Sequence, residues 1–196
     1  MPRIGQPRLP VAPVNSEQVA RRDAILSAGA RLARSKDLDC ISAQEIAAEA
    51  GVALRTLYRY YPSKYHVFAE LLTTQIDTIK LPESRSGSAV AEFMAEACRN
   101  MLRHKHLAGA MIISTQAVRA QSKASGYHAM RDVILQVAGV RVPTEDQIQA
   151  ARLVEQVTFG VLMWTVGGEL DTEQAIADVR LACRLLVADV FPEQES

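Results

Sequence analysis

The sequence predicts an all-α fold with about nine helices. Apolar residues recur at helical spacing in one segment after another, and Gly, Pro or helix-capping residues separate these segments. No segment shows the sustained alternation of apolar and polar residues, enriched in β-branched side chains, that is typical of strands. Hydrophobic residues make up 48% of the 196 residues and charged residues 22%, a composition that argues against a globally disordered chain.

Local signals at the helix ends set the expected boundaries. Ser42 and Glu45 have the spacing of a capping box, and so do Thr144 and Gln147, so each pair predicts a helix start. Gly51 ends the short helix that begins at Ser42. The expected helices cover residues 16–36, 42–50, 53–60, 63–81, 89–104, 107–121, 127–138, 145–166 and 173–191.

The chain divides into three expected parts. Residues 1–15 contain four prolines and no apolar core of signal-peptide length, so we expect a flexible tail. Residues 16–65 are expected to form a three-helix domain. Residues 66–196 are expected to form a larger helical domain, with a linker rich in helix-breaking residues at positions 81–88.

An aromatic and basic cluster occupies the third expected helix and the start of the fourth. Five of the ten aromatic residues lie within eleven positions: Tyr58, Tyr60, Tyr61, Tyr65 and Phe68. Three basic residues lie next to them or among them: Arg55, Arg59 and Lys64. No acidic residue occurs between Glu49 and Glu70. Guanidinium, hydroxyl and phenol groups without a carboxylate suit contact with DNA in the major groove, and the tight turn before them predicts a helix-turn-helix.

These residues resemble the N-terminal signature of TetR-type bacterial transcriptional regulators. The segments Ile46-Ala-Ala-Glu-Ala-Gly-Val52 and Thr56-Leu-Tyr-Arg-Tyr-Tyr-Pro-Ser-Lys64 carry the resemblance, which is dense over residues 20–70. The rest of the chain resembles the family only in its length and helical pattern. Within the family, the Thr-Leu-Tyr-Arg-Tyr run and the helix start at residues 143–147 look most like the actinobacterial regulators of steroid and lipid catabolism. The resemblance implies a ligand-responsive repressor that binds a palindromic operator.

The resemblance also implies which side chains contact the DNA. Eight are expected to do so: Ser42, Gln44, Arg55, Thr56, Tyr58, Arg59, Tyr60 and Lys64. Ser42 and Gln44 lie at a helix N-terminus, where free N–H groups and the helix dipole favour an anion. Arg55 and Thr56 are expected at base edges and Lys64 at a phosphate. Arg59 fits a phosphate contact and a solvated surface charge equally well. Tyr61 and Leu57 are expected in the core.

The last two expected helices carry more apolar surface than one core-facing stripe needs. On the helix over residues 145–166, Leu153, Phe159, Met163 and Trp164 spread beyond the main apolar stripe. The resemblance implies what covers them, because in TetR-type regulators the last two helices pack against their copies in a partner subunit. We therefore expect a homodimer through residues 145–191, which places two recognition helices about 34 Å apart in successive major grooves.

A hydrophobic effector site is expected in the same region of the chain. The family's regulatory domains enclose small-molecule sites here, and methionine adapts to irregular ligand shapes. The expected lining residues are Phe93, Met94, Met101, Met111, Met130, Phe159, Met163 and Trp164. None of them is ionisable, so a large neutral or lipid-like effector fits better than a sugar or an anion. Each of them also fits an ordinary core position.

Two other classes of protein stay open at this point, a small enzyme and a helical interaction module without DNA binding. The four histidines show no metal or triad grouping and are expected to face solvent: His66, His104, His106 and His128. No nucleophile elbow, P-loop or dinucleotide-binding motif occurs. Cys40, Cys98 and Cys183 are far apart and are expected to be free thiols. We expect no catalytic residue, metal or cofactor.

The net charge of zero conceals an uneven distribution. The chain has 22 basic and 22 acidic residues, but residues 1–65 contain ten basic and six acidic side chains. This third of the chain therefore carries +4 and the remainder −4. A basic, DNA-facing part and a mildly acidic body are expected. No apolar run reaches the ~20 residues of a membrane span, so we expect a cytoplasmic protein.

Overall fold

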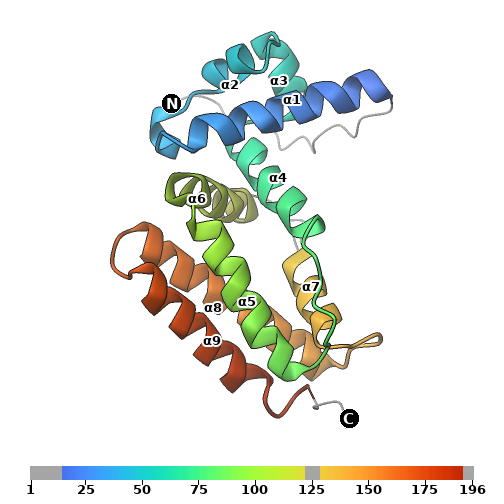
Figure 1. Ribbon diagram of the computed structural model, residues 1–196. Helices are drawn as coiled ribbons and strands as arrows, with labels where there is room; N and C mark the ends of the chain where they lie inside the picture. Colours follow the sequence, from blue (N-terminus) through green and yellow to red (C-terminus); the bar gives the residue numbers. More distant parts are fainter. Residues whose placement is uncertain (1–14, 122–128, 192–196) are drawn as a thin grey trace. The chain divides into compact units, whose positions relative to one another are not determined.

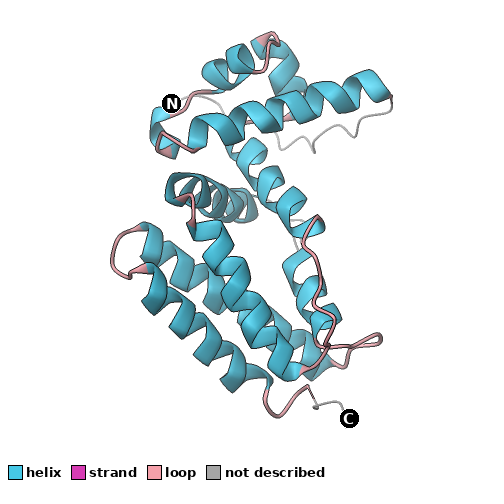
Figure 2. Cartoon of the chain, in the orientation of Figure 1, coloured by secondary structure: helices cyan, strands magenta, loops and turns pink. Residues whose placement is uncertain are grey.

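The computed structural model describes residues 15–121 and 129–191, which form nine α-helices and one short 3-10 helix, without a strand (Figure 1; Figure 2). The helices are α1 (Ser16–Ala33), η1 (Leu38–Cys40), α2 (Ala43–Glu49), α3 (Leu54–Tyr60), α4 (Lys64–Asp77), α5 (Gly87–Leu102), α6 (Lys105–Gln121), α7 (Ala129–Val137), α8 (Glu145–Val166) and α9 (Thr172–Val187). The prediction of an all-α chain is confirmed. Within the described residues no helix is long and apolar enough to cross a membrane.

The chain separates into two compact units. Of the described residues, the first unit contains 15–74 and 106–121, which cover α1, η1, α2, α3, most of α4 and nearly all of α6. The second unit contains residues 75–105 and 129–191, with α5, α7, α8 and α9.

In the first unit, α2 packs against both α1 and α3. Ile25, Ile46, Leu57 and Phe68 are fully buried and contribute to its core. Gly51 joins α2 to α3 with φ 67°, a left-handed conformation that glycine adopts without the steric cost of a Cβ atom. This turn allows two short helices to follow each other within a few residues, as the sequence predicts.

In the second unit, α9 lies alongside both α5 and α8, and α7 packs against α8 (Figure 1). The core includes Met94 of α5, Val154 of α8 and Val179 of α9, each at most 1% exposed. Where α5 begins, a Cβ atom on Gly87 would lie 2.7 Å from the carbonyl oxygen of Phe191. The backbone that follows α9 therefore approaches the start of α5 too closely for any other residue at that position.

The helix caps explain where the predicted boundaries hold and where they shift. The capping boxes at Ser42 and Thr144 are both present, as predicted. Helix α5 begins inside the expected linker because the Ser86 hydroxyl accepts a hydrogen bond from the amide of Ala89 at 3.2 Å. The 3-10 helix η1 is absent from the sequence prediction. The first two residues of the expected helix over 127–138 lie outside the described residues.

Candidate nucleic-acid interface

Helix α3 separates buried from exposed side chains by helical spacing. Leu57 is fully buried and Tyr60 is 3% exposed, so this side of the helix belongs to the core. Arg55, Tyr58 and Arg59 are exposed, and residues three or four apart share one face of a helix. The short helix therefore presents two guanidinium groups and one phenol together on its outer side.

The same face of α3 surrounds an open hollow. Its lining residues are Ala53, Arg55, Thr56, Tyr58 and Arg59. None of these side chains is acidic, and Thr56 adds a half-exposed hydroxyl between the arginines. Hydrogen-bond donors on a short exposed helix without a carboxylate are the chemistry that reads guanine and holds phosphate in a major groove.

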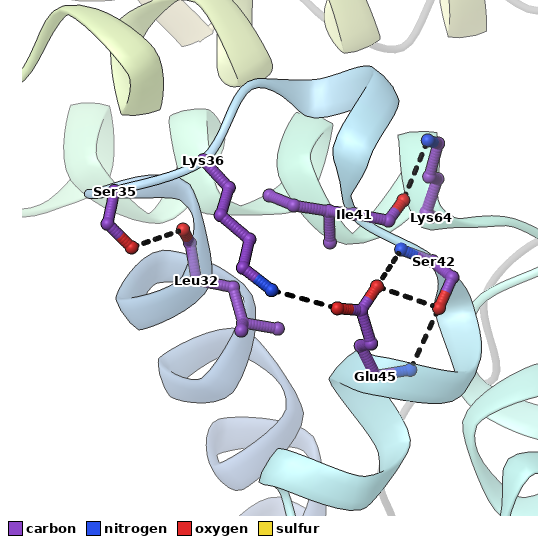
Figure 3. A network of polar contacts seen from close by, with 7 residues as sticks. All are labelled: Leu32, Ser35, Lys36, Ile41, Ser42, Glu45 and Lys64. Atoms are coloured by element: carbon purple, nitrogen blue, oxygen red, sulfur yellow. Dashed lines mark hydrogen bonds and ion pairs between the residues drawn. The ribbon is translucent and has the colours of Figure 1, made fainter.

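The start of α2 is occupied by its own capping box. The Ser42 amide donates to Glu45 Oε2 at 2.8 Å, and the Ser42 hydroxyl accepts from the Glu45 amide at 3.1 Å (Figure 3). The hydrogen bond from the Ser42 amide, together with one from Lys36, lowers the pKa of Glu45 to about 2. An ionised carboxylate thus lies at the helix end that was expected to bind phosphate. Ser42 and Gln44 are both exposed, and their contact with DNA stays a prediction.

Lys64, the first residue of α4, does not extend freely into solvent. Its ammonium group donates to the carbonyl oxygens of Leu38 and Ile41, both at 2.7 Å. The bond to Ile41 is drawn in Figure 3. Two of the three N–H donors of this half-buried lysine are therefore engaged by backbone in the chain without DNA.

Two tyrosines at the end of α3 lie in the core. Tyr61 is 1% exposed, as expected, and burial raises the pKa of its phenol. Tyr60 is also buried, with the Arg59 guanidinium 5.3 Å from its ring centroid. Its hydroxyl has no hydrogen-bond partner among the described residues. Contact between Tyr60 and DNA stays a prediction, and it requires this side chain to leave the core.

Comparison with known proteins decides the family. Residues 25–71 match the family described as bacterial regulatory proteins, tetR family, and residues 84–186 match the tetracyclin repressor-like C-terminal domain. The second match alone covers more than half of the chain. The chain belongs to the TetR family. It is therefore a transcriptional regulator and not an enzyme, as the resemblance implied.

Similar proteins of known structure or function agree with this assignment. A TetR transcriptional regulator from Rhodococcus sp. RHA1 superimposes with a TM-score of 0.82 at 38% identity, over 89% of this chain and 98% of that one. The HTH-type transcriptional repressor KstR of Mycobacterium tuberculosis is 26% identical over 88% of this chain and 83% of its own length. The fold is also that of Thermus thermophilus FadR, with a TM-score of 0.62 at 20% identity over 89% of this chain and 97% of that one.

Helices α8 and α9 expose large apolar side chains. Met163 and Trp164 on α8 are 37% and 59% exposed, and Leu181 and Leu185 on α9 are 49% and 73% exposed. A Cβ atom added at Gly160, one turn before Trp164, would meet no atom within 4 Å. This face is open in the single chain.

The residues expected at the effector site differ in burial. Met94, Met111 and Phe159 are buried, whereas Met163 and Trp164 belong to the exposed face of α8. The remaining three are half-buried: Phe93, Met101 and Met130. Only Met111 belongs to the first unit. That these residues bind an effector stays a prediction.

One buried ionisable residue was missed in the sequence. Glu155 on α8 is 5% exposed and lies one helical turn before Phe159. Its spacing from Ala151, Phe159 and Leu162 puts a carboxylate within the apolar stripe of α8, which was the available signal. None of the expected lining residues is ionisable, but Glu155 adds a buried carboxylate to the same helix as three of them.

The histidines and cysteines show ordinary structural surroundings. His66 is half-buried, with Nδ1 2.9 Å from the Ser63 hydroxyl, and burial lowers its pKa. The expectation that it faces solvent is wrong, whereas His104 and His106 are exposed and His128 lies outside the described residues. Cys98 and Cys183 are buried, and burial raises the pKa of both thiols to about 12. The described residues contain no cluster of three or more metal-ligating side chains.

Proposed function

We propose that this TetR-family chain is a repressor that binds a palindromic operator as a homodimer and is released by a hydrophobic small molecule. One observation carries the proposal. Helix α3 buries Leu57 and exposes Arg55, Tyr58 and Arg59 on one side, in a stretch of 20 residues without a carboxylate between Glu49 and Glu70. Arg55 and Thr56 read base edges, Arg59 and Tyr58 contact the DNA backbone, and Ser42 and Gln44 approach it from the start of α2.

The relatives support the proposed direction of control. KstR proteins of Mycobacterium tuberculosis and Rhodococcus jostii are both described as transcriptional repressors, at 26% identity. The Thermus thermophilus FadR structure contains lauroyl-CoA, so a protein of this fold holds a ligand with a long apolar chain. Together with the resemblance to regulators of steroid and lipid catabolism, this favours a lipid-like effector. Since operator DNA lies in the cytoplasm of a bacterium, the chain acts there.

The experiment is a selection of genomic DNA on the full-length chain. Sheared genomic fragments are incubated with the purified protein, and the bound DNA is sequenced. We expect enrichment of a few palindromic sites, one of them next to the chain's own gene. Affinity for an enriched duplex is then expected to fall steeply with salt, because phosphate contacts release counterions. Uniform recovery of fragments without any enriched site would contradict binding to a specific palindromic operator.

The effector proposal has its own test. An effector releases DNA only through its higher affinity for the conformation that does not bind DNA, and a shift from 99:1 to 1:99 needs about 5.5 kcal/mol. We expect lauroyl-CoA or a sterol-derived acid to release the enriched duplex in an anisotropy assay, whereas coenzyme A alone does not. Release by neither of these amphiphilic compounds, but by a sugar phosphate, would contradict a hydrophobic effector.

A further inference from the structure

The connection between α1 and α2 is held by side chains from several helices. Lys36 donates to Glu45 of α2 at 2.9 Å, and His106 of α6 lies with Nδ1 2.6 Å from Asp37 Oδ1. Lys64 of α4 donates to the backbone of Leu38 and Ile41. Of these contacts, the one from Lys64 is made to backbone rather than to a flexible side chain, so it constrains the path of the chain directly.

The carbonyl of Ile41 and the amide of Ser42 belong to one planar peptide group. Its oxygen accepts from Lys64 Nζ at 2.7 Å, and its N–H donates to Glu45 Oε2 at 2.8 Å (Figure 3). The peptide group is therefore hydrogen-bonded on both sides, to Lys64 of α4 and to Glu45 of α2. Because this peptide group immediately precedes the N-cap of α2, its orientation constrains the direction in which α2 begins.

The surroundings of Lys64 favour this arrangement over a free ammonium. Lys64 is the first residue of α4, where the positive end of the helix dipole disfavours a cation. The carbonyl oxygens of Leu38, the first residue of η1, and of Ile41, the residue that follows η1, offset this as hydrogen-bond acceptors for the ammonium. Leu38 is 6% exposed and Ile41 is fully buried, so with Lys64 in place both residues are shielded from water.

We infer that Lys64 is a positioning residue for DNA recognition, which fixes the helix-turn-helix by tying the start of α4 to the peptide before α2. Residues 41 and 64 bracket α2 and α3, and α2 packs on α3. Without the hydrogen bonds of Lys64, α2 and α3 can rotate together within the first unit, which misplaces Arg55 relative to the bases. The inference deepens the proposed function, on which it rests, and replaces the direct phosphate contact that the resemblance implied for Lys64.

Salt dependence separates positioning from a phosphate contact. The full-length Lys64→Met variant is titrated against the enriched operator duplex and an unrelated duplex over a series of salt concentrations, below its melting temperature. We expect operator affinity to fall roughly tenfold, as on loss of one base contact, with unrelated DNA bound almost as before and the salt slope unchanged. Arg59→Ala is the matched control, since removal of an exposed cation from a phosphate lowers both affinities alike and reduces the slope by about one.

The contrary results are equally specific. Equal weakening on both duplexes with a slope lower by about one, rescued by Lys64→Arg, would make Lys64 a phosphate contact. Wild-type binding by Lys64→Met would also overturn the inference. If this variant does not fold, hydrogen exchange of the Lys64→Arg chain decides: amides of residues 42–46 should exchange faster than in the wild type, and unchanged rates refute positioning. Exchange needs no DNA, so it stays informative if the wild type binds no operator and the proposed function fails.

Discussion

Arg55 and Arg59 lie one helical turn apart on the exposed side of α3. We expect Arg55 to contact base edges and Arg59 to contact the DNA backbone. Arg55→Ala should reduce the preference for operator over unrelated DNA by about 1–3 kcal/mol, the worth of a bidentate arginine–guanine pair. The measurement is anisotropy with both duplexes at one salt concentration. Arg103→Ala is the control, because it removes an exposed arginine that lies outside the first unit. An unchanged preference after Arg55→Ala would show that this side chain does not read bases.

Glu45 links the capping of α2 to acid stability. Its pKa is lowered from 4.5 to about 2 in the folded chain, so the ionised carboxylate stabilises the fold above its ordinary pKa. This contribution is lost as the pH falls through that interval. Glu45→Gln keeps a side chain that fits a capping box but does not titrate. We expect the variant's free energy of unfolding to fall less steeply than the wild type's over this pH range, measured by urea titration. Parallel curves would show that Glu45 is not linked to folding.

At the scale of elements, the exposed apolar face of α8 and α9 predicts the dimer. Leu185 is 73% exposed and Trp164 is 59% exposed on two helices that pack against each other, and exposed apolar patches mark protein–protein interfaces. Trp164→Asp should weaken association by about 2 kcal/mol or more, because buried aromatic residues dominate interface energies. Sedimentation equilibrium measures the effect, with Val142→Asp as the control at an exposed apolar residue outside both helices. A wild-type chain that sediments as a monomer would contradict the proposed dimer.

Elements with local signals were predictable, whereas those held by distant residues were not. The start of α2 at Ser42 and its end at Gly51 follow from a capping box and a left-handed glycine, both readable within ten residues. The 3-10 helix η1 has no such signal. The carbonyls of its first residue, Leu38, and of Ile41, which follows it, are bound by Lys64, 26 and 23 residues further along the chain. Only the folded chain brings these groups together.

The candidate site was likewise predictable only where local spacing determines it. Spacing along α3 correctly separated the buried Leu57 from the exposed Arg55 and Tyr58. It did not distinguish Tyr60 from its neighbours, because an aromatic side chain with a polar end fits both a core and a surface. The carbonyl partners of Lys64 also depend on tertiary contacts, so composition and spacing suggested only a free cation.

At the scale of the whole molecule, the grouping of helices departs from their order in the sequence. Residues 106–121 of α6 belong to the first unit, although α5 of the second unit precedes them in the chain. The hydrogen bond between His106 and Asp37 spans 69 residues and is one contact behind this grouping. Long-range contacts of this kind leave no local pattern, which is why the sequence suggested only a division near residue 65.

The distribution of charge over the whole chain agrees with the proposed function. The chain is neutral in sum, with ten basic and six acidic side chains in residues 1–65. Several of the basic side chains are paired within the fold, such as Arg31 with Glu49 and Lys36 with Glu45. Arg55 and Arg59 have no ion-pair partner among the described carboxylates, so their charge is available to DNA.

Native mass spectrometry of the full chain with the enriched operator duplex tests the central claim most directly. A repressor that binds through α3 as a homodimer must place its chains on the palindrome in pairs. We expect a complex whose mass corresponds to one duplex and an even number of chains, and whose population falls as salt in the sample is raised. A single chain per duplex, or the absence of any salt-sensitive complex with operator DNA, would contradict the account.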